Sequence, residues 1–241
     1  MEKKNVLIIG ASGGLGIHIA KFYNEQGFNL ALHYNDNVSS LKENFKVNKQ
    51  IHFFQADILS EEAIKNMITK VHSKLGGVDI LINAAGISTS SVTWKTEISD
   101  WDKTIGINLT GPFLCIKHVL PIMREYNYGR IINISSVVAQ SGVIGTAAYA
   151  ASKAGLIGMV KTIAKEVSNK NITINNIALG YFNAGMINQV PEELQVAIKE
   201  SIPKKAFGEM KELTNCISYL TSENSEYLTG QTINLNGGMY S

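Results

Sequence analysis

The segment 5–32 constrains the fold more than any other part of the chain. Residues 5–9 (NVLII) are a short apolar run rich in β-branched side chains, which predicts a buried parallel strand. The run leads directly into the turn GASGGLG at 10–16, an amphipathic helical pattern that stops near Gly27, and a second apolar strand at 30–32. A strand, glycine turn, helix and strand in this order is the context in which such a turn binds a dinucleotide. A flexible glycine loop without a ligand is the alternative, and the position directly after the first strand disfavours it.

The glycines of this turn have distinct expected tasks. Gly10 would allow the tight turn, Gly14 would let the backbone approach a diphosphate, and Gly16 would let the helix pack closely on the strand. The start of the helix would add free N–H groups and the positive end of its dipole. The residues expected to hold the phosphates are Gly10, Ser12, Gly13, Gly14, Leu15 and Gly16.

The rest of the chain continues the alternation of strands and helices. Further strands are expected at 51–56, 78–83, 129–134, 172–177 and 231–235, with helices at 61–75, about 102–125, from about Tyr149 to 168, and about 210–221. This alternation predicts an α/β fold, a doubly wound, mostly parallel Rossmann-type sheet of about seven strands in a single domain spanning 1–241. The irregular stretch at about 181–209 is the expected substrate lid.

Composition and charge exclude several classes of function. The chain has 241 residues, of which 45% are hydrophobic and 17% charged, and this suits one compact α/β domain. The net charge of +2 is spread without a basic run, so we expect no nucleic-acid partner. No apolar run approaches the roughly 18 residues of a membrane span, and the apolar run near the N-terminus is too short for a signal peptide. We therefore expect a cytoplasmic protein with no membrane partner.

Cysteines and histidines give no sign of a metal site. Cys115 and Cys216 stand alone within apolar helical patterns, so we expect reduced cysteines in the core. The five histidines lack metal-ligand spacing, and a surface or core position is expected for each of them. They are His18, His33, His52, His72 and His118.

Tyr149 and Lys153 are the candidate catalytic pair. Their i, i+4 spacing places both side chains on one helix face. An unperturbed tyrosine has a pKa of about 10, and a neighbouring ammonium lowers that pKa and makes the phenol a usable general acid or base. Ser136, thirteen residues upstream, could orient a carbonyl oxygen. Such a pair also occurs by chance on solvated helices, so its surroundings decide the interpretation.

Those surroundings are a series of strand ends. Ligands of doubly wound sheets bind outside the carboxyl ends of the strands. The candidate residues follow successive strands: the glycine turn at 10–16, then Asp57, Asn83, Ser136 and Gly180. We therefore expect residues that are scattered along the sequence to converge in space.

Together these segments resemble the short-chain dehydrogenase/reductase family over essentially the whole chain. Within the family the chain is most similar to the 3-oxoacyl-[acyl-carrier-protein] reductases, through the segments YAASKAGLIG, KNITINNIA and YLTGQTINLNGGMY. The matching family motifs are GASGGLG at 10–16, AD at 56–57, NAAG at 83–86, GINL at 106–109, GRIINISS at 129–136, YAASK at 149–153 and NLNGG at 234–238.

The resemblance implies a role for each catalytic candidate. Tyr149 would give a proton to the carbonyl oxygen as hydride arrives from a nicotinamide. Lys153 would lower the Tyr149 pKa and hydrogen-bond the nicotinamide ribose, and Ser136 would position the substrate carbonyl. Asn108, at a helix irregularity, would hold a water that relays protons to Lys153. Taken alone, Asn108 would be read as a polar residue within a helix.

The resemblance also implies a set of cofactor-binding residues. Asp57 would bind the adenine amino group, although alone it would be read as a helix N-cap. Segment 83–86 would line the adenine ribose, and Gly180 would close over the nicotinamide with its neighbours. The set beyond the glycine turn consists of Asn35, Asp57, Ile58, Asn83, Ala84, Ala85, Gly86, Tyr149, Lys153, Gly180, Phe182 and Ala184.

Four positions depart from the family pattern. Ile9 replaces a threonine whose hydroxyl ties the turn to the fourth strand, and Ala84 replaces an asparagine on the cofactor side. Leu179 stands where a proline is usual, and Ala184 replaces a threonine that reaches the nicotinamide carboxamide. None of these changes removes the acid, the base or a hydride-positioning group. We expect retained chemistry with altered cofactor affinity or lid geometry.

The end of the second strand bears on the choice of cofactor. A carboxylate there would bind the ribose 2′-hydroxyl of NAD and repel a 2′-phosphate. The position reads Tyr34 followed by Asn35, and Asp36 comes one or two residues too late. No arginine replaces the carboxylate, and Gly13 stands where related reductases often carry a basic residue. NADP(H) is therefore favoured over NAD(H).

The resemblance points to a 3-oxoacyl thioester as substrate, on acyl carrier protein or coenzyme A, and to fatty acid biosynthesis. Carrier-protein docking would use basic residues near the site, where Asn127 is neutral and Lys170 basic, and where Arg130 and Arg124 could compensate. The alternatives are an NAD(P)-dependent reductase or dehydrogenase acting on another ketone or secondary alcohol and, more remotely, a non-catalytic nucleotide sensor. A homotetramer is expected from the resemblance.

Overall fold

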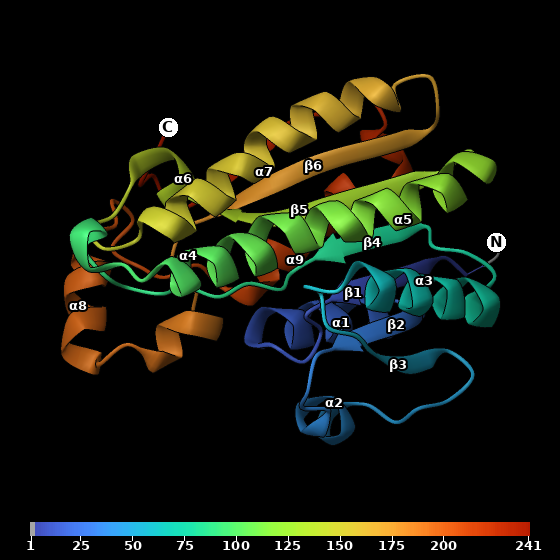
Figure 1. Ribbon diagram of the computed structural model, residues 1–241, viewed down its shortest axis with the longest axis horizontal. Coiled ribbons are helices and arrows are strands. Elements are labelled where there is room, and N and C mark those ends of the chain that lie inside the picture. Colours follow the sequence, from blue (N-terminus) through green and yellow to red (C-terminus); the bar gives the residue numbers. More distant parts are fainter. Residues whose placement is uncertain (1–2) are drawn as a thin grey trace.

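The computed structural model describes residues 3–241 (Figure 1). One sheet is formed by β1 (Asn5–Ile9), β2 (Asn29–Tyr34), β3 (Ile51–Gln55), β4 (Ile80–Asn83), β5 (Gly129–Ser136), β6 (Ile172–Leu179) and β7 (Thr232–Leu235). The strand order is β3-β2-β1-β4-β5-β6-β7, and all neighbours are parallel. The predicted doubly wound sheet is confirmed. Its order reverses between β1 and β4, the point where such folds bind ligands.

Helices cover both faces of the sheet. The front layer in Figure 1 holds α3 (Glu61–Leu75), α5 (Gly111–Glu125) and α7 (Ala147–Glu166), while α1 (Gly14–Glu25) and α9 (Met210–Leu220) lie behind. The alternation of β1 explains this arrangement, because successive side chains of a strand point to opposite faces. Leu7 and Ile9 join the core under α3, α5 and α7, whereas Val6 and Ile8 join the core under α1 and α9.

One helix is longer than the sequence predicted. α4 (Ile98–Ile105), a π turn (η2, Gly106–Thr110) and α5 run on without a break over Ile98–Glu125. By length and composition this helix could cross a membrane. Its α5 half instead buries Cys115 and Val119 in the core beneath the front layer. The apolar composition is thus used for packing on the sheet.

The segment 181–209 is more regular than predicted. It contains η3 (Gly185–Gln189) and α8 (Glu192–Ser201), and no residue of α8 is buried. Its two ends are joined, because Phe182 and Gly208 form a β-bridge and the Asn183 N–H donates to the Gly208 carbonyl at 2.9 Å. The short elements α2 (Ser39–Asn44), η1 (Thr93–Lys95), α6 (Val138–Ser141) and η4 (Glu223–Ser225) were not predicted either. A single turn of helix carries too little periodicity to be recognised.

Candidate active site at the carboxyl ends of the strands

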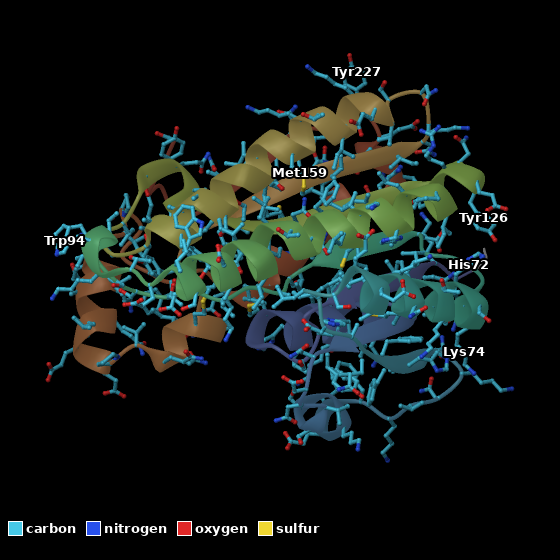
Figure 2. The ribbon with its side chains drawn as sticks, in the orientation of Figure 1. His72, Lys74, Trp94, Tyr126, Met159 and Tyr227 are labelled. Carbon is cyan, nitrogen blue, oxygen red and sulfur yellow. The ribbon has the colours of Figure 1, made fainter. Side chains whose placement is uncertain are left out.

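The structure brings several predicted site residues together beyond the ends of β1, β4 and β5. A Cβ atom placed on Gly86 would lie 3.4 Å from both the Asn108 Oδ1 and the Lys153 Nζ. A Cβ on Gly10 would lie 2.7 Å from the Ala85 Cα. Figure 2 labels Trp94 at the end of the molecule where α4 begins and α8 lies, and Tyr126 at the opposite end. The glycine turn and the segment after β4 therefore lie together, with Asn108 and Lys153 beside that segment. The use of these residues as a cofactor or catalytic site stays a prediction.

The glycine turn has the geometry of an anion site. Gly10 adopts a φ of +78°, which favours glycine, and a side chain on Gly16 would collide with the Gly10 carbonyl. Gly13 is the N-cap residue of α1 and offers no side-chain cap. Within residues 3–241, the N–H groups of Gly14, Leu15 and Gly16 donate to no acceptor. Free N–H groups at a helix start fit a diphosphate, so the turn is suited to a dinucleotide.

The segment 181–209 contacts this turn. A Cβ on Gly14 would lie 2.7 Å from the Gly185 Cα, so the first turn of η3 rests on the start of α1. Gly185 itself has a φ of +77°. The sequence did not single out Gly185, although a glycine soon after the sixth strand was a usable signal.

Asn108 lies in the π turn and is fully buried. Its Oδ1 accepts from the Ile87 N–H at 2.9 Å, and its Nδ2 donates to the Ile87 carbonyl at 2.8 Å and to the Ser152 Oγ at 3.1 Å. The helix irregularity implied by the resemblance is therefore present. The Asn108 amide fixes the loop after β4 against α7, and Ser152, which the sequence did not single out, is part of that link. The water relay stays a prediction.

Ser136 and Tyr149 form the centre of the site. A hydrogen bond from Ser136 lowers the pKa of the Tyr149 phenol, but burial has the larger effect and raises the pKa, as does nearby Tyr181. The sequence predicted a lowered Tyr149 pKa because of Lys153, and this direction is wrong for the structure. The Lys153 Nζ lies 5.8 Å from the centre of the Tyr149 ring and donates instead to the Ile134 carbonyl at 2.8 Å.

Lys153 is hydrogen-bonded through both its backbone carbonyl and its side-chain ammonium. The Ser135 hydroxyl donates to the Lys153 carbonyl at 3.0 Å, while the ammonium binds the backbone of β5. Burial lowers the pKa of Lys153 to about 8. At neutral pH most of the ammonium is still charged, so a positive charge stands beside Tyr149. That charge would stabilise a phenolate once a proton has left.

The residues expected around the adenosine differ from one another in burial and in hydrogen bonding. Asp57 is exposed, and its Oδ1 accepts from the Leu59 N–H at 2.9 Å, while Ser60 caps α3. The side chain of Ile58 is buried in the core, which leaves only its backbone to line a ligand. The Asn35 Nδ2 donates to the Asp36 Oδ2 at 2.6 Å, so a carboxylate does stand at the end of β2.

Asn83 belongs to a row of buried asparagines that crosses the sheet. Asn83, Asn133 and Asn176 occupy matching register positions on β4, β5 and β6, and we call them the asparagine row. The Asn83 Nδ2 donates to the Asn133 Oδ1 at 2.8 Å, and the Asn133 Nδ2 donates to the Asn176 Oδ1 at 3.2 Å. The register neighbour of Asn83 on β1 is Ile9, and the buried Asn83 Oδ1 has no partner among the described residues. Ile9, which stands in place of the threonine noted in the sequence, offers this oxygen no hydroxyl.

At the end of β6 the chain is packed tightly. The Gly180 N–H donates to the Leu235 carbonyl at 2.9 Å, and a Cβ on Gly180 would lie 2.8 Å from the Asn236 Cα. The ring of Phe182 is buried, and it fills the space that a Cβ on Gly208 would need. Contact between these residues and a nicotinamide stays a prediction.

The residues considered for carrier-protein docking lie elsewhere in this chain. Asn127 and Lys170 precede β5 and β6, so they stand at the edge of the sheet opposite the site. Figure 2 labels Tyr126, the neighbour of Asn127 in the sequence, at the end of the molecule away from Trp94. Arg130 is only 1% exposed, and its guanidinium donates to the carbonyls of Asn171 and Ser222. Arg130 therefore cannot compensate for the neutral Asn127, because the Arg130 guanidinium is buried and hydrogen-bonded within the protein.

Comparisons with known proteins agree with this geometry. The family model described as enoyl-(acyl carrier protein) reductase matches residues 10–240. A 3-oxoacyl-[acyl-carrier-protein] reductase FabG of Staphylococcus epidermidis is 39% identical over 98% of this chain and 99% of its own length. A FabG of Staphylococcus aureus is 37% identical, with 98% of each chain covered. Nodulation protein G of Azospirillum brasilense is 37% identical over 99% of each chain.

Proposed function

This chain belongs to the short-chain dehydrogenase/reductase family and is an NAD(P)-dependent oxidoreductase, and from that premise we propose that it reduces 3-oxoacyl thioesters to 3-hydroxyacyl thioesters. The observation that carries the proposal is the placement of the Tyr149 phenol between Ser136, which lowers its pKa, and the buried Lys153 ammonium, 5.8 Å from the centre of the Tyr149 ring. The names of the Staphylococcus relatives support a thioester substrate.

The chain's own residues divide the chemistry among them. A nicotinamide, when bound at the glycine turn, would supply the hydride that reduces the carbonyl carbon. The Ser136 hydroxyl would hold the carbonyl oxygen beside the Tyr149 phenol, which transfers its proton to that oxygen, so that hydride and proton together convert the ketone into an alcohol. A raised pKa suits this direction, because the phenol stays protonated at neutral pH. The Lys153 charge then stabilises the phenolate until a proton returns.

We propose NADPH as the preferred cofactor. The free N–H groups of Gly14, Leu15 and Gly16 would hold the diphosphate, and Asn35 and Asp57 would flank the adenosine. The neutral pair Tyr34 and Asn35 supports acceptance of a 2′-phosphate. The carboxylate of Asp36 beside Asn35 opposes this preference, and it is expected to limit rather than reverse it.

The decisive experiment follows NADPH oxidation with acetoacetyl-coenzyme A for the wild type and Tyr149→Phe. General acid catalysis contributes about 10²- to 10⁴-fold, so we expect the variant to lose at least about 10²-fold in kcat while NADPH still binds. Tyr181→Phe is the matched control, because it removes a phenol next to the site and should keep most of the activity. Turnover of Tyr149→Phe at the wild-type rate would overturn the mechanism.

The second candidate is reduction of another ketone by the same residues. It is favoured by the neutral Asn127 and the buried Arg130, which leave this chain without two of the charges considered for carrier-protein docking. A panel of acyl carrier protein thioesters, coenzyme A thioesters and simple ketones separates the two. Turnover of simple ketones without any thioester would favour the second candidate. NADPH binding without turnover of any ketone would favour a nucleotide sensor.

The proposed assembly and location rest on the resemblance. We propose a homotetramer that forms through the helices spanning Ile98–Glu125 and α7, and a cytoplasmic location. Light scattering tests the assembly directly. A mass close to 26.3 kDa would show a monomer and overturn the tetramer.

A further inference from the structure

His33 occupies a junction between three strand ends. It lies near the end of β2 and is 2% exposed. Its Nδ1 accepts from the Gly10 N–H at 3.0 Å, and its Nε2 lies 2.9 Å from the Ala56 carbonyl. Its own carbonyl accepts from the Ala11 N–H at 2.9 Å. A single residue therefore accepts hydrogen bonds from two consecutive N–H groups of the glycine turn and also hydrogen-bonds the loop after β3.

These partners allow only one form of the ring. The Gly10 N–H can only donate and the Ala56 carbonyl can only accept, so Nδ1 must be bare and Nε2 must carry the proton. A protonated imidazole would place a second donor against the Gly10 N–H and break that bond. Gly10 has little freedom to move away, because it is already packed against Ala85.

The surroundings keep the ring neutral. Burial lowers the pKa of His33 below its usual value of 6.5, and this effect exceeds the opposing effect of the Ala56 bond and of the nearby Asp57 carboxylate. Asp57 is the charged side chain that acts on the ring, and it follows Ala56 at the end of β3. Both groups joined by His33, the glycine turn and the Ala56–Asp57 turn, are expected to contact the same cofactor.

We propose that His33 is a positioning residue for the nicotinamide cofactor. Its neutral ring ties the diphosphate-binding turn at Gly10 to the adenine-side turn at Asp57, and its protonation releases the glycine turn. The inference rests on the nicotinamide-dependent activity of the chain, and it adds a residue that touches neither the substrate nor the reacting atoms. It predicts an affinity for cofactor that falls at acidic pH, as the His33 ring becomes protonated.

Calorimetric titration with NAD⁺ between about pH 7.5 and about pH 5 tests this. NAD⁺ is the suitable probe because it lacks the 2′-phosphate, whose own titration near pH 6 would obscure the profile. We expect the wild type to bind more weakly at the acidic end. His33→Asn keeps an acceptor near the Nδ1 position and does not titrate, so it should bind NAD⁺ with a flat profile. His33→Leu removes both ring bonds and should weaken binding about tenfold at every pH.

Two controls separate this role from a merely structural one. His18→Asn removes an exposed histidine on α1 and should keep the wild-type pH profile. Nitrogen NMR of the cofactor-free protein at neutral pH should show a bare Nδ1 and a protonated Nε2 on His33. The opposite tautomer, or identical pH profiles for the wild type and His33→Asn, would overturn this inference alone. Failure of both nicotinamides to bind would overturn the proposed function with it.

Discussion

The strand ends carry two buried polar arrangements that differ in how completely they are bonded. On the β1–β3 side, the ring of His33 uses both nitrogens, one toward Gly10 and the other toward Ala56. On the β4–β6 side, the asparagine row is bonded from Asn176 to Asn83 and stops there, with the Asn83 Oδ1 unpaired. In the first arrangement both ring nitrogens have a hydrogen-bond partner, whereas the second ends in a buried oxygen without one.

The difference comes from what the neighbouring strand offers. His33 faces backbone groups of two turns, and every residue other than proline supplies such groups whatever its side chain. The register neighbour of Asn83 on β1 is Ile9, whose side chain carries no polar group, so a bond from this side would depend on the identity of one residue. Polar side chains bonded to backbone therefore withstand substitution around them better than rows of side chains bonded to one another.

The largest effect is expected from breaking the asparagine row at its centre. Asn133→Leu would leave the Asn83 Nδ2 and the Asn176 Oδ1 unpaired, and each buried unpaired group costs about 1 to 3 kcal/mol. We expect the free energy of unfolding to fall by about 2 to 4 kcal/mol, measured by denaturant titration. Asn66→Leu, at an exposed position on α3, is the control and should change it by less than about 0.5 kcal/mol. Equal losses in the two variants would contradict the importance of the row.

A smaller effect is expected from completing the row. Ile9→Thr would offer a hydroxyl to the Asn83 Oδ1, and Ile9→Val has nearly the same shape without the hydroxyl. A buried threonine normally destabilises a core relative to valine because its hydroxyl loses water. Here we expect the threonine variant to be the more stable of the two by about 1 kcal/mol in thermal and denaturant unfolding. A more stable valine variant would show that the Asn83 oxygen cannot be reached from β1.

The smallest effect is expected on the β1–β3 side of the sheet, at the exposed end of β2. Asp36→Asn removes a carboxylate beside Asn35, so a 2′-phosphate would meet less repulsion there. We expect the ratio of NADPH to NADH affinity to rise about two- to fivefold at low salt and less at high salt. Glu25→Gln removes one negative charge at the far end of α1 and serves as control. An unchanged ratio in Asp36→Asn would place Asp36 outside the cofactor site.

The order of elements could be predicted from the sequence because it depends on periodicity. The seven strands lie where apolar runs predicted them, since strands buried on both faces read as short continuous apolar segments. The helix irregularity around Asn108 followed only from the resemblance. The closeness of the glycine turn and the segment after β4 followed from the common edge at which parallel strands end. Single-turn helices such as α6 were missed because four residues carry no detectable period.

The details of the site depend on contacts that periodicity does not encode. The raised pKa of Tyr149 reflects burial and nearby Tyr181, while the Lys153 ammonium donates to the Ile134 carbonyl, and neither can be read from an i, i+4 spacing. His33 and Asn133 were recognisable only as polar residues inside apolar strands. Such a residue in a buried strand needs a partner, and the sequence alone does not say which one.

The π turn at Gly106–Thr110 makes the geometry of the site depend on the number of residues in one helix. A π turn holds more residues than an α turn, so deleting one residue there would restore a regular helix. It would also rotate the two halves against each other by about 100°. Since α4 contacts α7 while α5 contacts α3, one of those faces would turn away from its partner. Surface loops generally tolerate a change in length. A deletion in this π turn would instead disrupt the helix packing that holds Asn108 against Ile87 and Ser152.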